Sequence, residues 1–217
     1  KVPARPCVFE YVYFSRPDSI VGGKAVHEYR KKLGEELAKE LSIDDDIVSA
    51  VPDSGIPAAI GYSNQSKITY DMGIIRNHYV GRTFIEPTQQ IRQLGVKLKH
   101  NANKEIIKNK RLILVDDSIV RGTTSKKLVD MLYNAGAKEI HLCISSPPIK
   151  HPDYYGIDTP NIKDLIAANH NNEEIRKIIG VDTLQYLSIE GLYRALGHEK
   201  RNEKNPQFTD HCFTGDY

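Results

Sequence analysis

Short apolar segments that end in turn residues alternate along this chain with longer segments in which apolar residues follow a helical period. This alternation is typical of an α/β protein, in which helices flank a mainly parallel sheet. We expect strands over residues 47–51, 68–75, 112–115, 140–145 and 184–188.

Two longer segments show the spacing of amphipathic helices. Between residues 23 and 41, apolar residues recur at helical spacing among Lys, Arg and Glu, which predicts a helix with one face on the protein surface. A second series runs from Leu128 to Ala135, and Gly136 follows it as the expected C-terminal cap.

The pattern becomes irregular after Pro147, where only short helices are expected, over residues 162–168, 173–179 and 189–196. No internal repeat divides the chain. We therefore expect one domain over residues 1–217, with a core over about 1–147 and a small irregular appendage over about 148–217.

The composition fits a globular protein with a sizeable core, because 40% of the 217 residues are apolar and 27% are charged. Lys and Arg total 30 against 28 Asp and Glu, and the formal net charge of +2 gives no general reason to expect a nucleic acid or a membrane as partner. No window reaches the roughly 18 consecutive apolar residues of a membrane span, and the first residues lack the apolar core of a signal peptide. We expect a cytoplasmic protein.

Cysteine and histidine give little support for a disulfide or a zinc site. Cys7, Cys143 and Cys212 are widely spaced and odd in number. Cys143 lies in an apolar segment and is expected to be a buried thiol. The eight histidines show no HExxH motif or other zinc-ligand spacing, so a metal site must be sought among the carboxylates.

The segment 111–125, with the sequence RLILVDDSIVRGTTS, combines an apolar strand, two carboxylates and a turn rich in hydroxyl groups. Ligands of open α/β sheets bind beyond the carboxyl ends of the strands, where Asp116 and Asp117 are expected, at an exposed strand tip. Two adjacent carboxylates can accept hydrogen bonds from a sugar diol and help to hold a hydrated Mg²⁺.

The amides and hydroxyls that follow are expected at a helix N-terminus, which favours a phosphate group. Gly122 would let the backbone approach such a ligand closely. An ordinary turn followed by helix capping would explain each part alone, but not the whole combination in one run of residues. The segment is neither a Walker loop nor a GxGxxG motif.

This segment resembles the phosphoribosylpyrophosphate-binding loop of the type I phosphoribosyltransferases, and VDDSIVRGTTS is similar in particular to the glutamine phosphoribosylpyrophosphate amidotransferases. Similar segments cover most of the chain: FEYVYFSRPDS, VPDSGIPAAIGY, IIRNHYVGRTFIEP, SSPPIKHPDYYGIDTP and CFTGDY. The resemblance implies the type I phosphoribosyltransferase fold. It implies Mg²⁺ bound through Asp116 and Asp117, and phosphoribosylpyrophosphate bound by Asp116, Asp117, Ser118, Arg121, Gly122, Thr123, Thr124 and Ser125.

The segment 51–57, VPDSGIP, follows a predicted strand and precedes a run of small residues. A simple turn would explain this composition. In the family that it resembles, this position is the loop that binds pyrophosphate, which implies roles for Asp53, Ser54 and Gly55. Relatives often have Ser where this chain has Gly55, so backbone or water must replace that hydroxyl.

The segment 76–84 is basic, aromatic and interrupted by glycine, without the period of a core element. A solvated charged loop is one interpretation. The resemblance implies instead the flexible catalytic loop of the family, which closes over the substrate and excludes the water that competes with ammonia. The candidate catalytic residues are Arg76, Tyr79, Arg82 and, with less support, Lys99.

The resemblance implies an enzyme that displaces pyrophosphate from phosphoribosylpyrophosphate with ammonia and forms phosphoribosylamine, at the first committed step of purine synthesis. In the family, a glutaminase domain precedes this part and supplies ammonia from glutamine. We expect that domain to be absent from this chain, which begins at Lys1, so that the chain alone would use free ammonia. A homo-oligomer is also expected.

Some members of the family carry an iron–sulfur cluster on four cysteine thiolates. Cys7 and Cys212 match two of the positions, but Asp153, Pro206 and Thr209 stand where cluster-bearing relatives have cysteine. A complete cluster is therefore not expected in this chain.

Two alternatives stay open. A phosphoribosyltransferase that acts on a base, such as orotate or a purine, shares the phosphate loop, but the signature over residues 76–87 argues against it. A non-catalytic regulator that senses phosphoribosylpyrophosphate would be expected to add a DNA-binding segment. The chain shows no helix-turn-helix pattern and no basic arm.

Overall fold

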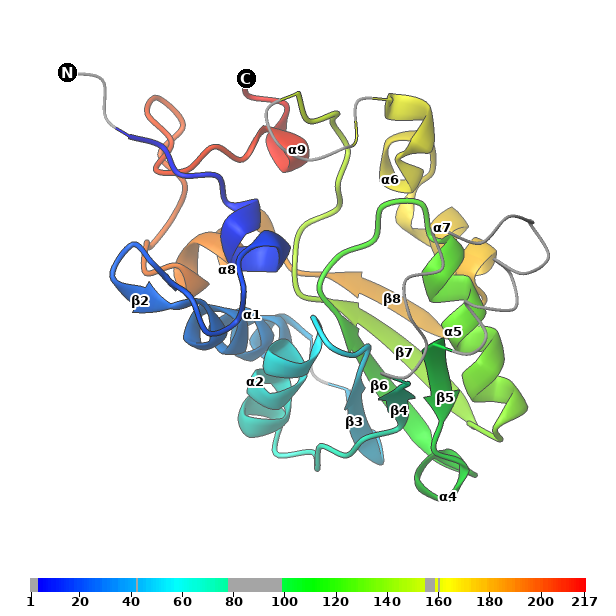
Figure 1. The fold of residues 1–217 in the computed structure, drawn as a ribbon. Helices are drawn as coiled ribbons and strands as arrows, with labels where there is room; N and C mark the ends of the chain where they lie inside the picture. The colour runs from blue at the N-terminus through cyan, green and yellow to red at the C-terminus, as the bar shows by residue number, and fades with distance from the viewer. Residues whose placement is uncertain (1–3, 42, 78–98, 155–158, 160) are drawn as a thin grey trace.

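A parallel four-stranded sheet forms the centre of the molecule (Figure 1). The computed structural model describes residues 4–41, 43–77, 99–154, 159 and 161–217. The sheet has the order β3-β6-β7-β8, and its strands are β3 (Ile47–Ala50), β6 (Arg111–Asp116), β7 (Glu139–Ile144) and β8 (Thr183–Tyr186). The two central strands are buried from their second residue onward, because helices cover both of their faces.

The register of the sheet brings the carboxyl ends of the strands to one edge. Ala50 pairs with Val115, and Asp116, the last residue of β6, pairs with Ile144. The chain leaves β3 and β6 at the same edge, so the polar residues that follow the two strands are neighbours in space. This edge is where an open α/β sheet binds its ligands.

Three helices cover one face of the sheet: α1 (Val26–Glu40), α2 (Ile56–Ser66) and α8 (Ile189–Ala195). The first two cross closely at two glycines. A Cβ atom on Gly34 would lie 1.8 Å from the carbonyl oxygen of Ala58, and one on Gly61 would lie 1.9 Å from the carbonyl oxygen of Lys31. The backbones of α1 and α2 therefore touch at positions where only glycine fits.

The other face of the sheet is covered by α5 (Thr123–Asn134), α6 (Ile166–Asn169) and α7 (Asn172–Ile179). Buried residues of α5 and α7, such as Leu132 and Ile179, pack with Leu112 and Leu142 of the sheet in one apolar cluster. Asn171 begins α7 with a capping box, in which its side chain and that of Glu174 satisfy each other's backbone N–H groups.

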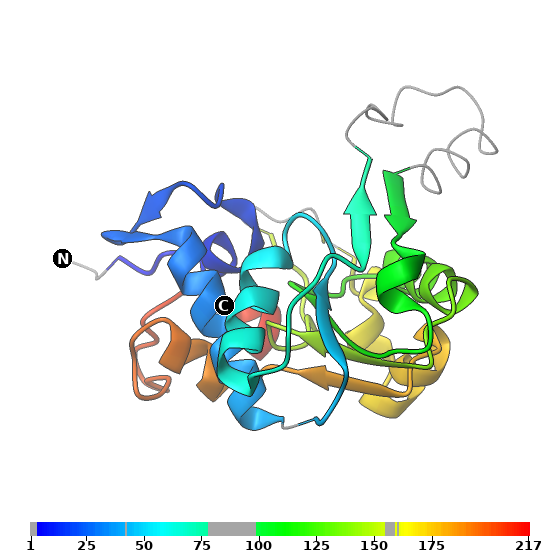
Figure 2. The same ribbon diagram turned by 90° about the horizontal axis from the view of Figure 1, so that it is seen from below.

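Two short antiparallel pairs lie outside the central sheet. The first joins β1 (Ile20–Val21) to β2 (Lys24–Ala25), and the second joins β4 (Ile74–Arg76) to β5 (His100–Ala102). Figure 2 shows β4 and β5 standing out from the layered body at one end of the sheet. A short helix, α4 (Lys104–Ile107), leads from β5 back to β6.

The two ends of the described chain lie side by side. The N-terminal part contains a π-helix, η1 (Glu10–Phe14), and the C-terminal part ends near α9 (His211–Thr214). Val8 donates a backbone hydrogen bond to Thr209, and Thr209 donates one to Pro6. A short 3₁₀ helix, η3 (Ile162–Asp164), precedes α6.

Buried charges fix the C-terminal segment. The guanidinium group of Arg201 contacts both carboxylate oxygens of Asp210 at 2.7 and 3.1 Å and donates to Asp216 at 2.6 Å. Tyr193 of α8 donates to the same Asp210 at 2.8 Å. The C-terminal segment is thereby bound to a helix of the main body.

Most of the expected elements are present, and the architecture is the expected α/β arrangement of helices around a mainly parallel sheet. The strand predicted over residues 68–75 is wrong over most of its length, because only Ile74 and Ile75 belong to β4 and Tyr70 makes one isolated bridge to Val48. The hairpin of β1 and β2 and the helix α2 were not predicted. The strand predicted over residues 184–188 is present as β8, at the edge of the central sheet and within the residues 148–217 expected as an appendage.

Candidate functional site

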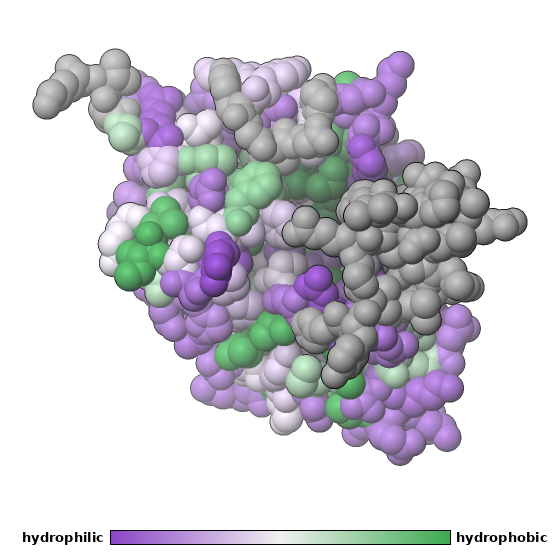
Figure 3. All heavy atoms as spheres, in the orientation of Figure 1, coloured by the Kyte–Doolittle hydropathy of each residue, from purple (hydrophilic) through white to green (hydrophobic). Residues whose placement is uncertain are grey.

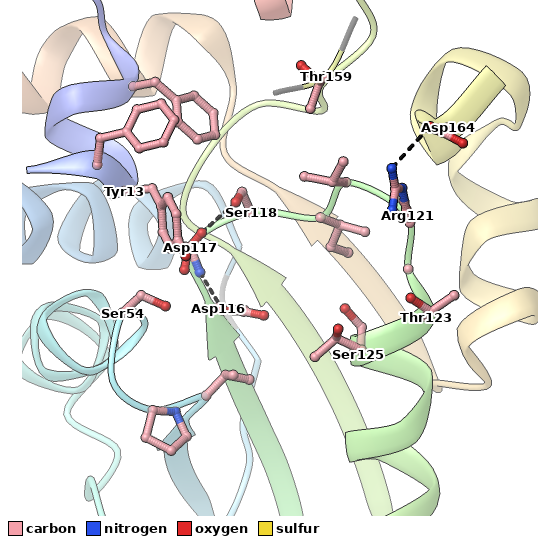
Figure 4. Close-up of a pocket in the computed structure, with 18 of the residues that line it drawn as sticks. Tyr13, Ser54, Asp116, Asp117, Ser118, Arg121, Thr123, Ser125, Thr159 and Asp164 are labelled. Carbon is pink, nitrogen blue, oxygen red and sulfur yellow. Dashed lines mark hydrogen bonds and ion pairs between the residues drawn. The ribbon is translucent and has the colours of Figure 1, made fainter. Parts of the chain in front are cut away.

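A cleft of about 610 Å³ opens at the carboxyl ends of β3 and β6 (Figure 4). Most of its lining comes from three parts of the sequence: Phe9 with the helix η1, the loop after β3, and the segment that joins β6 to α5. Thr159 and Asp164 also line it. His100 of β5 also lines the cleft. The sheet topology thus brings together the two polar segments that the sequence singled out.

Asp116 and Asp117 form the floor of this cleft. The backbone N–H of Asp117 donates to the Asp116 carboxylate at 2.8 Å, and the hydroxyl of Ser118 donates to the Asp117 carboxylate. The two residues are 8% and 6% exposed, so the expectation of an exposed strand tip is wrong. They are buried because η1 and the loop after β3 lie beside the strand end, and both residues line the cleft.

Burial raises the pKa of both carboxyl groups. For Asp116, the neighbouring charge of Asp117 raises the pKa further. For Asp117, hydrogen bonds from Ser118 and Ser54 and the charge of Arg30 act in the opposite direction. Two carboxylates held together away from water favour any ligand that brings positive charge or hydroxyl donors to them.

The N-terminus of α5 forms the second part of the site. The helix begins at Thr123, and no side chain caps its first backbone N–H groups. Gly122 has a φ of +74°, and a Cβ atom at this position would lie 2.8 Å from Ile166. A helix end with uncapped backbone N–H groups and two hydroxyls beside it, those of Thr123 and Thr124, is chemically able to bind an anion such as phosphate.

Arg121 and Ser125 lie on either side of this helix start. Ser125 is buried and lines the cleft. The guanidinium group of Arg121 contacts the carboxylate of Asp164 in η3 at 3.1 Å, as the dashed line in Figure 4 shows. Both partners are largely exposed, so this ion pair is weak and the guanidinium can exchange partners at little cost.

The loop after β3 supplies the wall opposite α5. Ser54 lines the cleft and donates a hydrogen bond toward Asp117, and Asp53 forms an ion pair with Arg76 of β4. Gly55 precedes α2 as its N-cap residue. A Cβ atom on Gly55 would lie 2.6 Å from the carbonyl oxygen of Val115, so this backbone presses directly against the end of β6.

The residues expected in the catalytic loop are only partly described. Arg76 ends β4 and Lys99 precedes β5, at the two ends of the segment 78–98. Tyr79 and Arg82 lie outside the described residues. His100 was missed by the sequence analysis, because its neighbours Pro52, Asp53 and Arg76 are distant in the sequence.

An aromatic wall closes the remaining side of the cleft. Phe9, Tyr13 and Phe14 line it, and the ring centroids of Phe9 and Phe14 are 5.6 Å apart. The buried guanidinium group of Arg30 donates to the backbone carbonyls of Tyr11 and Ser15 and so holds η1 against α1. Stacking surface therefore faces the acid pair across the cleft.

The positions discussed for an iron–sulfur cluster lie together near the chain ends. Cys7 and Thr209 pair in a β-bridge, and Cys212 is buried in α9. Asp153, which stands where some relatives have cysteine, contacts the imidazole of His211 at 2.8 Å, and both side chains are 2% exposed. Among the described residues, no group of three or more His, Cys, Asp or Glu side chains is arranged to hold a metal ion. The absence of a cluster stays a prediction.

The outer surface gives no sign of a membrane span. None of the helices formed by the described residues is long and apolar enough to cross a bilayer. The face shown in Figure 3 is mostly hydrophilic, with separate small apolar patches.

Comparison with known proteins supports the resemblance. Residues 23–152 match the family of the phosphoribosyl transferase domain. Over 216 residues, the chain is 61% identical to the amidophosphoribosyltransferase of Rhizobium etli, covering 99% of this chain and 44% of that protein. It is 53% identical to the amidophosphoribosyltransferase of Bacillus subtilis, covering 97% of this chain and 44% of that protein.

The fold agrees with the sequence comparison. A solved structure of the glutamine phosphoribosylpyrophosphate amidotransferase of B. subtilis, complexed with ADP and GMP, superposes with a TM-score of 0.88 at 52% identity. The match covers 98% of this chain and 47% of that one, so the chain spans less than half the length of these relatives. The chain therefore belongs to the phosphoribosyl transferase family, and it matches the amidophosphoribosyltransferases over nearly its whole length.

Proposed function

We propose that this chain is the part of an amidophosphoribosyltransferase that binds phosphoribosylpyrophosphate and transfers its phosphoribosyl group to ammonia, forming 5-phosphoribosylamine. The observation that carries the proposal is a single cleft with three polar parts: the buried acid pair, the N-terminus of α5 and the loop after β3. A sugar that carries phosphate at two separate positions needs such a combination.

The three parts match the three parts of the substrate. The 5-phosphate would lie on the amides of residues 121–125 and the hydroxyls of Thr123, Thr124 and Ser125. The ribose hydroxyls would donate to Asp116 and Asp117, with Ser118 holding the second carboxylate in place. The pyrophosphate group would lie against residues 53–55, where Arg76 can leave Asp53 for a stronger anion.

Magnesium fits the acid pair. Burial raises the pKa values of Asp116 and Asp117, the charge of Asp117 raises that of Asp116 further, and a divalent cation would relieve this cost. The two carboxylates would not need a third protein ligand, because Mg²⁺ keeps several waters and binds substrate phosphates. When bound, the ion would neutralise charge on the departing pyrophosphate.

The protein's own contribution would be positioning and electrostatic stabilisation. The C1–O bond breaks with its electron pair on pyrophosphate, while ammonia attacks the opposite side of C1 and the ring passes through an oxocarbenium-like state. The ammonium group formed on C1 then loses a proton to solvent, which gives the amine. Asp117 and Asp116 face the ribose and stabilise positive charge on it, and the amides of the loop after β3 stabilise the leaving anion.

The wider setting rests on the relatives. They are named amidophosphoribosyltransferases and are more than twice as long as the matched segment, so the remaining length has room for a glutaminase domain that supplies ammonia. We place the activity in purine biosynthesis, in the cytoplasm and in a homo-oligomer. The names of the relatives favour ammonia as acceptor over a base such as orotate, and they favour an enzyme over a sensor.

The experiment measures pyrophosphate release from phosphoribosylpyrophosphate with Mg²⁺. The expected rate rises with ammonium concentration and with pH, because only unprotonated ammonia is nucleophilic. Release that requires orotate or a purine base would support the base-transferring alternative. Tight binding without release under any of these conditions would support a regulator.

A further inference from the structure

His100 is a cleft residue to which the proposed function gives no role. It begins β5 and is half-buried, and its side chain lines the cleft together with Pro52 and Ser54. In the antiparallel pair of β4 and β5, His100 stands directly opposite Arg76. Directly opposed residues of a pair point to the same face, so the imidazole and the guanidinium group are neighbours.

The surroundings of His100 are those of an anion site. Arg76 and Lys99 carry positive charge near it, and the carboxylate of Asp53 and the backbone carbonyl of Pro52 are also close to its imidazole. Asp53 already pairs with Arg76. His100, Arg76 and Lys99 therefore form a small group of basic side chains beside the loop after β3, and the carboxylate of Asp53 partly balances their charge.

The position of this group in the cleft decides which anion it meets. Figure 4 shows Ser54 on one side of the acid pair and Thr123 on the other. Because His100 adjoins Pro52, it lies on the Ser54 side, away from the N-terminus of α5. An anion near His100 is thus separate from one bound at the helix.

We propose that His100 is a direct ligand of the pyrophosphate group, which it contacts from β5 opposite the loop 53–55. This inference rests on the proposed function and adds a residue to it. The imidazole would donate a hydrogen bond to a pyrophosphate oxygen, next to the guanidinium group of Arg76. A hydrogen bond from a protonated imidazole to a phosphate oxygen is charge-assisted and stronger than a neutral one.

The protonation of His100 is then coupled to the ligand. In this structure burial lowers the pKa of His100, and the charges of Arg76 and Lys99 lower it further, whereas the Pro52 carbonyl and Asp53 raise it. Among the described residues that line the cleft, the other charged side chains are those of Asp116, Asp117, Arg121 and Asp164. A bound polyanion outweighs the two cations and raises the pKa, so the imidazole takes up a proton when pyrophosphate binds.

The sign of the pH effect follows from this shift. His100 has a higher pKa in the pyrophosphate complex than in the free protein. Its contribution to pyrophosphate affinity is therefore small above the pKa of the complex, and it increases as the pH falls toward the pKa of the free protein. Pyrophosphate itself also takes up protons in this pH range. The contribution of His100 to the pH dependence of binding is therefore measured as the difference between the wild type and a variant that has no imidazole.

The test is calorimetry of inorganic pyrophosphate binding with Mg²⁺ near neutral pH, in two buffers that differ in ionisation enthalpy. The slope of the binding enthalpy against the ionisation enthalpy of the buffer gives the number of protons that the protein takes up for each pyrophosphate bound. We expect His100→Gln to bind pyrophosphate roughly ten-fold more weakly and to take up fewer protons than the wild type. His170→Gln, which changes an exposed histidine outside the cleft, is the matched control and should behave as the wild type.

A second variant separates charge from structure. His100→Lys carries a fixed positive charge, so it should bind pyrophosphate better than His100→Gln but without the proton uptake of the wild type. Equal proton uptake in the wild type and both variants would overturn the inference while leaving the proposed function intact. No binding of pyrophosphate by the wild type would contradict the proposed function itself, and the inference with it.

Discussion

The close crossing of α1 and α2 predicts that Gly34→Ala destabilises the protein and disturbs the cleft. The added Cβ atom would lie 1.8 Å from the carbonyl oxygen of Ala58, and an ordinary contact begins at 3.4 Å. The helices would have to separate by about 1.6 Å at this point. The obstacle is backbone, so no flexible side chain can move aside.

The magnitude follows from two opposing effects. Overpacking of this kind costs up to about 3 kcal/mol, and replacing Gly by Ala inside a helix returns about 1 kcal/mol. We therefore expect a loss of about 2 kcal/mol in the free energy of unfolding. For a chain of this length, that loss lowers the Tm by roughly 4 to 8 °C.

The assay is thermal unfolding followed by circular dichroism, with pyrophosphate binding measured on the same samples. Because α2 begins directly after the loop 53–55, its displacement should also weaken binding. Asn64→Ala, on the exposed side of α2, is the control and should change the free energy of unfolding by less than about 0.5 kcal/mol. A Gly34→Ala protein with a Tm equal to that of the wild type would refute the argument from helix contact.

Three further predictions concern the site and the chain ends. Asp116→Asn should have a higher free energy of unfolding than the wild type at neutral pH. The difference should grow as the pH rises from the ordinary pKa of a carboxyl group to the raised pKa of Asp116, because ionisation of the buried carboxyl group is unfavourable in the folded wild type; chemical unfolding at several pH values measures it. Arg82→Ala should lower the ammonia-dependent rate more than it weakens substrate binding, as a kcat and KM comparison would show; an unchanged rate would exclude Arg82 from the closing loop. Protein purified anaerobically should contain no stoichiometric iron, because Asp153 replaces a thiolate; about four irons per chain would contradict this.

The segment 111–125 could be interpreted from the sequence because its chemistry is local. The strand, the acid pair and the helix start are contiguous, and each has a distinct composition. Its burial could not be predicted in the same way. Asp116 and Asp117 are covered by η1 and by the loop after β3, which are distant in the sequence. The carboxyl end of β6 would be exposed on an isolated strand, but these segments bury it in the folded protein.

The errors in the fold have physical causes as well. The segment 68–75 has the composition of a strand, but its bridge to the central sheet is confined to Tyr70 and Val48, and Ile74 and Ile75 instead pair with β5 as part of β4. Helix α2 was hidden because Pro57 and Gly61 resemble loop residues. Proline is tolerated in the first turn of a helix, and Gly61 is needed for the contact with α1.

His100 shows the limit of reasoning from motifs. Histidine in a short polar strand has no pattern of its own, and its significance comes from Pro52 and Arg76, which the fold brings beside it. Lys99, the neighbouring residue, was singled out only through the family resemblance. Sites that are assembled from separate segments require the structure, whereas sites within one segment do not.

The central claim is that the buried acid pair and the cleft around it bind phosphoribosylpyrophosphate with Mg²⁺. Calorimetric titration of phosphoribosylpyrophosphate into the wild type, with and without Mg²⁺, tests this binding. The same titration is made with Asp117→Asn, and Asp130→Asn, which changes an exposed residue of α5, is the control. We expect Mg²⁺-dependent binding by the wild type and by the control, and much weaker binding by Asp117→Asn. Wild-type affinity in Asp117→Asn, or binding that does not depend on Mg²⁺, would contradict it.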